Sequence, residues 1–337
     1  MRPRRFVRLS PRARSRRRLW WVIGGVVAFA VAIVGVVATV KVSHELAASP
    51  PAVGTRIAVP VDSKAARAAA STSDPEEKAA AQFLAAQPTA YWLTPEETPP
   101  GSAGQRVQDL IESSREQDAA LVLVVYGLPE RDCGNFSAGG LSPEAYTEWI
   151  EEIAGPLHAA GDVRKIVIVE PDSLALAPEC GNLDQRLPEL RMVVDRLAST
   201  NTWLYLDGGH SNWLPASEMA ELISAVGAQD AVRGFATNVS NFQADADEFA
   251  YARELSSLLG GAHAVIDSSR NGAGPTGEWC NPAGRLVGEA PGTFGDEVVD
   301  TNLWIKPPGE SDGECNGGPR AGQWWPDAAK ELTREAR

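Results

Sequence analysis

Short apolar runs alternate with amphipathic stretches along most of the chain. The runs are rich in Val, Ile, Leu and aromatic residues, as is typical of strands buried on both faces of a parallel sheet. Between them lie longer segments with the spacing and composition of helices. We expect seven strands, at residues 90–93, 121–126, 165–170, 202–207, 233–238, 263–267 and 301–306.

The segments between these runs carry helix start and stop signals. Ser142 precedes a proline and an acidic residue, so we expect it to cap a helix. The stretch 245–259 begins with acids and is followed by two glycines, a common stop signal. Strands that alternate with helices predict a parallel sheet with crossover helices. We therefore expect an α/β fold, a distorted seven-stranded parallel β/α barrel over 79–337, with a doubly wound open sheet as the alternative.

The first part of the chain has a different pattern. Residues 1–18 hold nine arginines and no acid, and residues 19–40 are 22 residues without a charge. About 20 apolar residues span a bilayer, whereas a cleaved signal has an apolar region of about 7 to 15 residues. We expect a cytoplasmic Arg-rich segment at 1–18 and a transmembrane signal anchor at 19–40, with a cleaved signal peptide as the alternative. Residues 41–78, rich in Ala, Ser, Pro and Val, are expected to be a flexible linker.

The charge balance indicates the kind of partner. The positive-inside rule places the arginines in the cytoplasm and the rest of the chain on the extracellular side of the plasma membrane, or in the medium if the signal is cleaved. Without those nine arginines, 22 basic residues face 44 acidic ones, a net charge of −22. So acidic a body repels nucleic acid, and we expect no nucleic-acid partner.

Four cysteines lie in the predicted extracellular part: Cys133, Cys180, Cys280 and Cys315. None is in a CxxC pair, and the four histidines are scattered, so a zinc site is not indicated. Cysteines outside the cell favour two disulfides, and four cysteines allow three pairings. We expect no metal and no cofactor.

Polar side chains follow the expected strands where functional groups of a parallel barrel gather, at the carboxyl ends. Acids occur after five of the seven strands, more than helix capping needs. Histidine is too scarce for metal-assisted hydrolysis, and no GxSxG nucleophile elbow is present. Carboxylate pairs together with tryptophans are typical of glycoside cleavage, because carboxyl groups move protons and aromatic faces bind sugar rings.

Two long motifs make this interpretation specific. "VVYGLPERDCGNFSAGG" and "IVIVEPDSLAL" resemble the two signature motifs of glycoside hydrolase family 6, cellulases that cleave β-1,4-glucan with inversion. "YLDGGHSNWL", "GFATNVSNF", "DSSRNG", "EWCNPAGRLVG" and "LWIKPPGESDGEC" resemble its later blocks, in the same order. The resemblance covers about 90–337 and implies a distorted barrel, usually of seven strands.

The resemblance also implies catalytic roles. Asp172 matches the general acid, and Asp132 matches the aspartate that helps to keep that acid protonated, as a neighbouring carboxylate does. Asp312 matches the proposed base, although the base of this family is debated and a chain of waters is an alternative. Ser137 matches the serine that positions the water, and Tyr126 matches the tyrosine that presses on the sugar at the cleavage point.

The resemblance implies binding roles and a disulfide pairing as well. It pairs Cys133 with Cys180 and Cys280 with Cys315, each tying down a catalytic loop. It implies contacts with sugar rings and hydroxyls, and places further polar residues on the same rim. The expected substrate-binding residues are Trp92, Asp207, His210, Trp213, Asn238, Trp279, Lys306 and Glu310.

The mode of cleavage depends on the loops that roof the groove. Only "CNGGPRAGQ" separates Cys315 from the closing "WWPDAA", so we expect an open cleft, internal cleavage of cellulose or a related β-glucan, and a monomer. The alternatives are an exo-acting cellobiohydrolase of the same family and a non-catalytic glycan-binding protein of the cell surface. The intact Asp132, Asp172 and Asp312 argue against the second.

Overall fold

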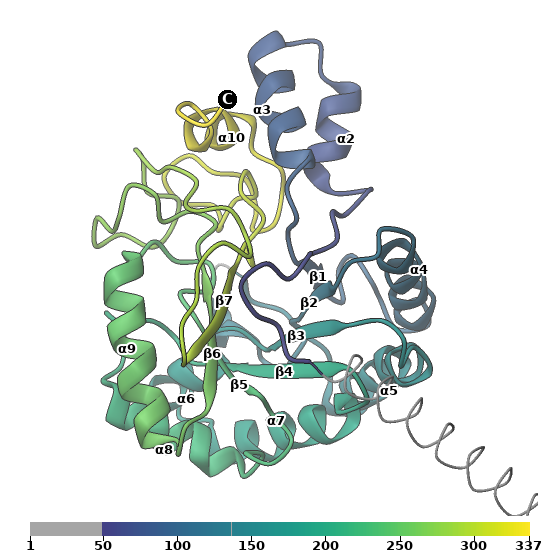
Figure 1. Cartoon of the computed structure of the whole chain (residues 1–337), viewed down its shortest axis with the longest axis vertical. Coiled ribbons are helices and arrows are strands. Elements are labelled where there is room, and N and C mark those ends of the chain that lie inside the picture. Colours follow the sequence, from purple (N-terminus) through teal and green to yellow (C-terminus); the bar gives the residue numbers. More distant parts are fainter. Residues whose placement is uncertain (1–48, 136) are drawn as a thin grey trace, which may run out of the picture. The chain divides into compact units, whose positions relative to one another are not determined.

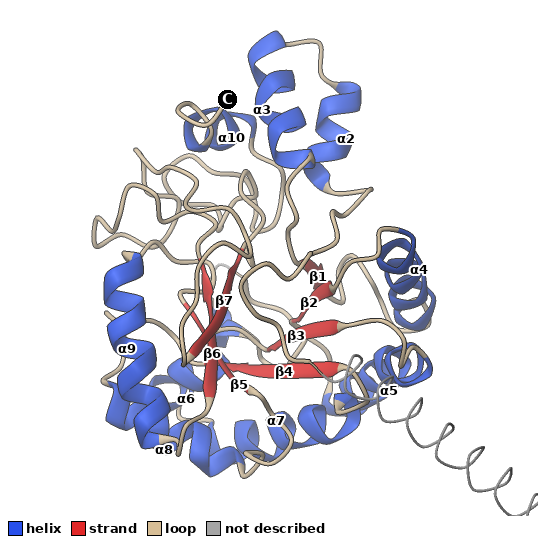
Figure 2. Ribbon diagram, in the orientation of Figure 1, coloured by secondary structure: helices blue, strands red, loops and turns tan. Residues whose placement is uncertain are grey.

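Seven parallel strands form one sheet and lie in it in the order in which they occur along the chain (Figures 1 and 2). The structure, a computed structural model, describes residues 49–135 and 137–337. All seven predicted strands are present within three residues of the expected bounds, and the last one, expected at 301–306, differs most. They are β1 Tyr91–Leu93, β2 Leu121–Val125, β3 Lys165–Val169, β4 Thr202–Asp207, β5 Gly234–Thr237, β6 His263–Asp267 and β7 Val299–Leu303.

Helices cover the outer face of this sheet (Figure 2). Ser142 caps α5 as predicted, because its hydroxyl accepts a hydrogen bond from the Ala145 amide at 3.3 Å. The helices are α2 Lys64–Ser71, α3 Pro75–Ala85, α4 Ala103–Glu116, α5 Pro143–Ala159, α6 Ser173–Cys180, α7 Leu183–Leu197, α8 Ala216–Val226, α9 Asp245–Leu258 and α10 Pro326–Leu332, with a short 3-10 turn, η1, at Asp132–Gly134. The sheet curves into an open barrel, because within the described residues no strand ladder joins β7 to β1.

Alternate residues of each strand face two different apolar cores. In β2, Leu121, Leu123 and Val125 pack against the helices, while Val122 and Val124 point into the barrel. This period of two is the geometry of a strand buried on both faces. Tyr126 continues the inward series and is 6% exposed. The strand register therefore delivers its phenol ring to the carboxyl end of the barrel.

The N-terminal strap, defined here as residues 50–58, fills a gap in the barrel. Strand β1 pairs only with the second half of β2, and the strap takes the place below it. Ala58 N–H donates to Ala120 O at 2.9 Å, and Gly54 N–H donates to Gly292 O at 2.8 Å. Ile57 enters the inner core and is 8% exposed. The strap thus completes the barrel where the backbone ladder is missing.

The prediction of a flexible linker over 41–78 is wrong from residue 50 onward. Helices α2 and α3 follow the strap, and α3 packs against α10 (Figure 1). A third apolar cluster, made mainly of alanines against Trp304, holds them there. Alanine side chains each bury little apolar surface, so these short helices contain few of the large apolar residues from which a sequence pattern predicts a packed helix. The folded unit therefore begins at Pro50, and the expected boundary at 79 is corrected.

The expected cytoplasmic segment 1–18, the expected membrane anchor 19–40 and the first part of the expected linker lie outside the described residues. None of the helices in the described part of the chain is long and apolar enough to cross a bilayer.

The strap yields a stability prediction. Replacement Ile57→Ala removes buried apolar atoms from the inner core, so we expect it to lower the free energy of unfolding by about 2 to 4 kcal/mol. The control Val61→Ala, at a side chain that is 72% exposed, should change it by less than about 0.5 kcal/mol. Urea unfolding of the full chain measures both, and equal effects of the two substitutions would show that the strap does not stabilise the barrel.

Candidate active site

A cleft of about 1160 Å³ lies at the carboxyl ends of the strands. Loops that follow all seven strands line it, which is the usual position of the site in a parallel barrel. Most of the residues singled out from the sequence meet there. The cleft is lined by Trp92, Tyr126, Asp132, Ser137, Asp172, His210, Trp213, Trp279, Lys306, Glu310 and Asp312.

Tyr126 and Asp132 form a hydrogen-bonded pair on one wall. The tyrosine hydroxyl donates to Asp132 Oδ2 at 2.6 Å. Burial raises the pKa of Asp132, while the hydrogen bond from Tyr126 and the charge of Arg131 act in the opposite direction. The Arg131 guanidinium lies 4.4 Å from the centre of the tyrosine ring and pairs with Glu96 at 2.9 Å. Arg131 therefore packs against the tyrosine of this pair, while both Tyr126 and Asp132 line the cleft.

Asp172 lies between other carboxylates, directly after β3. Burial raises the pKa of Asp172 well above its usual range, and the negative charges of Asp132, Asp207 and Asp312 raise it further. The ammonium of Lys306 opposes them, with a smaller effect on the pKa than Asp132 or Asp207. A carboxyl group in such surroundings keeps its proton near neutral pH. Asp172 is thus equipped to donate a proton to a group bound in the cleft.

Asp207 was expected among the substrate-binding residues, but it does not line the cleft. It is 2% exposed, and its Oδ2 accepts hydrogen bonds from the Asp172 amide at 3.0 Å and the Gly209 amide at 3.2 Å. Burial raises the pKa of Asp207 to about 7. Asp207 thus supports the backbone of Asp172 from below. Its side chain points into the barrel beneath the rim, which puts it out of reach of a ligand in the cleft.

Asn238 was also expected to bind substrate, and the structure buries it completely. Its amide nitrogen donates to Asp267 O at 2.8 Å, and its Oδ1 accepts from the Gln243 amide at 2.9 Å. The residue has a positive φ of 62°, which turns the following chain outward. Ser240 and Asn241 line the cleft in its place.

Asp312 is a fully paired carboxylate. Arg270 Nη1 lies 2.9 and 3.0 Å from its two oxygens, and the Asn281 amide donates to Oδ2 at 3.1 Å. Lys306 Nζ is 3.7 Å from Oδ1. Arg270 belongs to the "DSSRNG" block, but its partner is 42 residues away, so the sequence did not indicate this ion pair.

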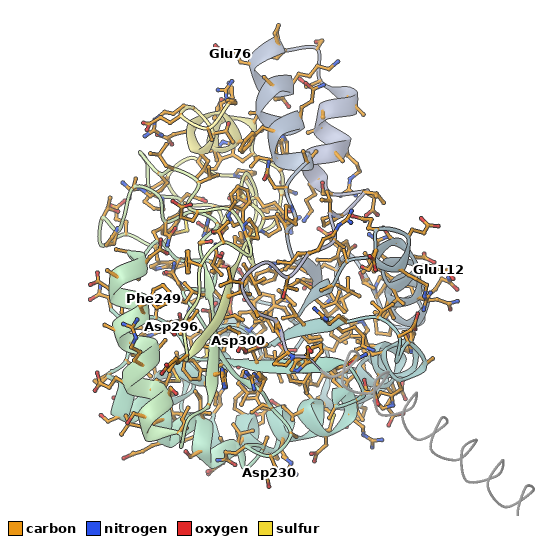
Figure 3. The ribbon with its side chains drawn as sticks, in the orientation of Figure 1. Glu76, Glu112, Asp230, Phe249, Asp296 and Asp300 are labelled. Atoms are coloured by element: carbon orange, nitrogen blue, oxygen red, sulfur yellow. A yellow bond between two sulfur atoms is a disulfide. The ribbon has the colours of Figure 1, made fainter. Side chains whose placement is uncertain are left out.

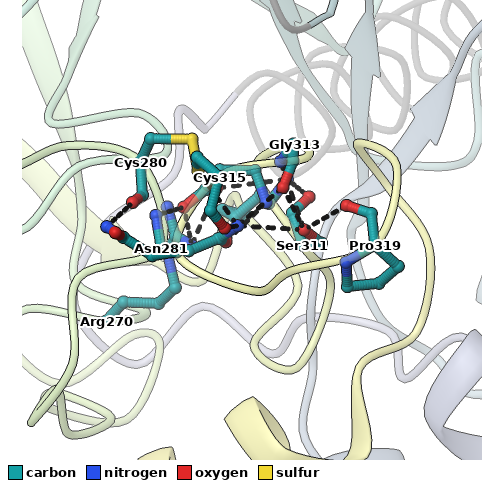
Figure 4. The surroundings of a disulfide bond; sticks show 10 residues. Arg270, Cys280, Asn281, Ser311, Gly313, Cys315 and Pro319 are labelled. Carbon is teal, nitrogen blue, oxygen red and sulfur yellow. Dashed lines mark hydrogen bonds and ion pairs between the residues drawn. A yellow bond between two sulfur atoms is a disulfide. The ribbon is translucent and has the colours of Figure 1, made fainter.

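Both disulfides that the resemblance implies are present, Cys133–Cys180 and Cys280–Cys315. The second one joins two loops of the cleft, and Asn281 beside it donates to backbone carbonyls of the loop that carries Asp312 (Figure 4). The first joins the turn after Asp132 to the helix after Asp172. Each disulfide therefore anchors loops that carry acids of the cleft.

Aromatic side chains offer surfaces for a sugar ring. Trp92 donates its indole N–H to Ile305 O at 2.8 Å and meets Tyr126 edge to face. Trp279 is 51% exposed. Burial lowers the pKa of His210 to about 4, and its Nδ1 accepts from the Asn212 amide at 3.2 Å. The neutral imidazole therefore carries its proton on Nε2, as a donor to a ligand.

Glu170 is a functional residue that the sequence interpretation did not single out, although it belongs to the "EPDS" motif. It is completely buried and accepts hydrogen bonds from the amides of Gly127 and Leu128 and from the Tyr146 hydroxyl. It thereby holds the first residues of the loop that leads from Tyr126 to Asp132. Burial raises the pKa of Glu170 to about 7.

Within 49–135 and 137–337, His, Cys, Asp and Glu side chains form no group suited to a metal ion. The acids of the cleft are instead bonded to arginine, tyrosine and backbone amides. Carboxyl groups held in this way can take part in proton transfer.

The raised pKa of Glu170 predicts a pH dependence of stability. Its pKa rises from 4.5 to about 7 in the folded protein. Its contribution to the free energy of unfolding is therefore full below about pH 4.5 and is lost as the pH rises through 7. In the unsubstituted chain this effect lowers the free energy of unfolding by about 3 kcal/mol between pH 4.5 and 7.5, and Glu170→Gln should remove that decline. Urea unfolding at both pH values tests this, with Glu112→Gln, at an exposed residue of α4 (Figure 3), as the control. Parallel pH profiles of Glu170→Gln and the unsubstituted chain would contradict it.

Comparison with known proteins gives this arrangement a family. The model of glycosyl hydrolases family 6 matches residues 54–336. Endoglucanase A of Cellulomonas fimi is 41% identical over 262 residues, which are 77% of this chain and 57% of that enzyme. Endoglucanase 1 of Streptomyces halstedii is 37% identical, over 80% of this chain and 86% of that enzyme. The chain thus spans little more than half of the Cellulomonas enzyme.

A solved structure agrees with the fold as well as with the sequence. The endoglucanase Cel6 of Mycobacterium tuberculosis, in complex with methyl-cellobiosyl-4-deoxy-4-thio-β-D-cellobioside, superimposes with a TM-score of 0.78 at 39% identity. The match covers 84% of this chain and 98% of that one. Because the family match spans the folded unit almost from end to end, the chain belongs to glycosyl hydrolases family 6.

Proposed function

We propose that the protein hydrolyses internal β-1,4-glucosidic bonds of cellulose or a related β-glucan, with inversion of the anomeric carbon. The observation that carries this proposal is the carboxyl group of Asp172, which burial and neighbouring acids keep protonated at the floor of an aromatic-lined cleft. The relatives' names support the substrate, since the matched enzymes are endoglucanases. The solved relative was captured with a cellobiose-derived thio-sugar.

Asp172 acts as the general acid. As the bond between the anomeric carbon and the glycosidic oxygen breaks, the proton of Asp172 moves to that oxygen, and the positive charge that develops on the sugar is stabilised by the carboxylates nearby. Tyr126, fixed by its hydrogen bond to Asp132, lies under the sugar ring whose glycosidic bond is broken. Asp132 remains the ionised neighbour that keeps the proton on Asp172.

Water attacks the opposite face of the anomeric carbon, and the new bond carries the inverted configuration. Asp312 is the proposed base, with Ser137 positioning the water. The two hydrogen bonds from Arg270 keep the Asp312 carboxylate oriented, so the proton of the water reaches it directly or through a chain of waters. The sugar units on either side of the cleaved bond are held by Trp92, Trp213, Trp279, His210, Lys306 and Glu310.

Internal cleavage is supported by the openness of the site. The exposed Trp279 and the short segment between Cys315 and Trp324 leave the groove accessible from its side. The chain works as a monomer outside the cytoplasm, where its two disulfides persist. An N-terminal anchor at 19–40 would hold it at the extracellular face of the membrane, and signal cleavage would release it.

Stereochemistry provides the first test. NMR of the full chain with cellotetraose should show the α-anomer of the new reducing end before mutarotation. Asp172→Ala should lower kcat by about a thousandfold, the usual contribution of a general acid. An early β-anomer would show retention and exclude Asp312 as a base, and binding without any cleavage would favour the glycan-binding protein.

Viscosity provides the second test. An enzyme that cuts internal bonds should reduce the viscosity of carboxymethylcellulose about tenfold before a few per cent of the bonds are hydrolysed. Viscometry combined with a reducing-sugar assay measures this ratio. Release of cellobiose with little loss of viscosity would favour the exo-acting alternative.

A further inference from the structure

Lys64 connects the N-terminal region with the cleft. It is the first residue of α2, and its ammonium lies 3.0 Å from Glu310 Oε2 and 2.7 Å from Glu97 Oε1. Glu97 belongs to the loop after β1 and Glu310 to the loop after β7. The lysine therefore bridges the loops of the two edge strands, which no backbone ladder joins in the described residues.

The ion pair with Lys64 stabilises the Glu310 carboxylate, whose burial would otherwise disfavour the charged form. The Glu310 side chain is 12% exposed, and burial raises its pKa, whereas the charges of Lys64 and Lys306 lower it. Glu97 is the other charged group facing this carboxylate, and its effect is to raise the pKa. A buried carboxylate without a partner takes up a proton or turns towards solvent. Lys64 thus keeps Glu310 ionised and oriented.

The cleft does not end at this pair. Arg67 and Ser71, one and two helical turns further along α2, also line it, and so does Glu77 of α3. A ligand seated on Glu310 therefore has a continuing polar wall on the same side. This wall consists of residues for which the sequence pattern predicted only a linker.

We propose that Lys64 is a positioning residue that determines specificity: by holding Glu310 it fixes where a sugar unit binds at this end of the cleft, and so which bond of the glucan lies over Asp172. The inference rests on the proposed glucanase function. A glucan that places a sugar unit next to Glu310 gains hydrogen bonds to an ionised carboxylate. Such bonds are about twice as strong as those to neutral groups. Binding registers that use this position are therefore favoured over registers that leave it empty.

The bond preference of the full chain on cellopentaose tests the proposal. The pentamer is labelled with ¹⁸O at its reducing end, and mass spectrometry of the products gives the frequency of cleavage at each bond. In Lys64→Met, cleavage at one set of bonds should fall about tenfold relative to the others, and KM should rise about tenfold, as expected for loss of a charge-assisted hydrogen bond. The kcat of the remaining registers should stay within about twofold.

Three further variants separate positioning from folding. Lys64→Arg keeps the bridge and should restore the bond preference. Glu97→Gln, at a side chain that is 44% exposed, removes the second ionic partner of Lys64. The less firmly held lysine should move the preference in the same direction by a smaller factor, although loss of the Glu97 charge by itself lowers the pKa of Glu310. Lys78→Met, at an exposed lysine of α3 that does not line the cleft, should behave as the unsubstituted chain.

The pH dependence gives an independent readout. Protonation of Glu310 weakens sugar binding, so KM rises as the pH falls. Without Lys64 the pKa of Glu310 is higher, and that rise in KM should begin at a higher pH. A merely structural loss would lower the rate at every bond equally, together with Tm, and would leave this profile in place.

The outcomes are distinguishable. Lys64→Met with an unchanged bond preference and an unchanged pH profile of KM overturns the inference, and so does a uniform loss of rate. An unsubstituted chain that leaves cellopentaose intact overturns the proposed function and this inference with it.

Discussion

Crowding of carboxyl groups at the end of the barrel is the constraint on which the rest of the site depends. Asp132, Asp172 and Asp207 lie close enough for their negative charges to interact, so they do not all ionise together. The proton that remains is held by Asp172, whose pKa is raised by burial and by the charges of the other two. Arg131 stabilises one edge of this group of acids and Lys306 the other. The arrangement favours the protonated form of Asp172.

Keeping these groups in place requires an unusual backbone. Asp132, Cys133, Glu170 and Asp172 all have positive φ, between 47° and 66°, a region that residues other than glycine adopt at a free-energy penalty. Surrounding bonds hold this backbone in place. The Cys133–Cys180 disulfide fixes the turn that contains Asp132, and the Glu170 carboxylate accepts a hydrogen bond from the Gly127 amide, which precedes that turn. Stability is thus concentrated in covalent and buried links directly behind the reacting groups.

Much of this architecture could be predicted from the sequence. Most of the strands have continuous apolar runs, although β7, with the sequence VDTNL, does not. The two long motifs identify the acids and the cysteine pairs through resemblance. The burial of Asn238 could not be predicted, because its side chain bonds to Asp267 O and to the Gln243 amide on neighbouring turns. The partners of Arg270 and Lys64 lie 42 and 246 residues away. Long-range ion pairs of this kind leave no local pattern.

The strap at 50–58 has a consequence for the order in which the molecule is assembled. Its bonds join Gly54 to Gly292 and Ala58 to Ala120, so the Gly54 end of the strap is paired only after most of the chain has left the ribosome. Contacts between such distant segments form slowly, because a long loop must close first. Until then this end of the strap stays unpaired, and unpaired backbone groups invite association with other chains. The interval between synthesis and closure of the barrel is therefore the period in which this protein most needs protection from aggregation.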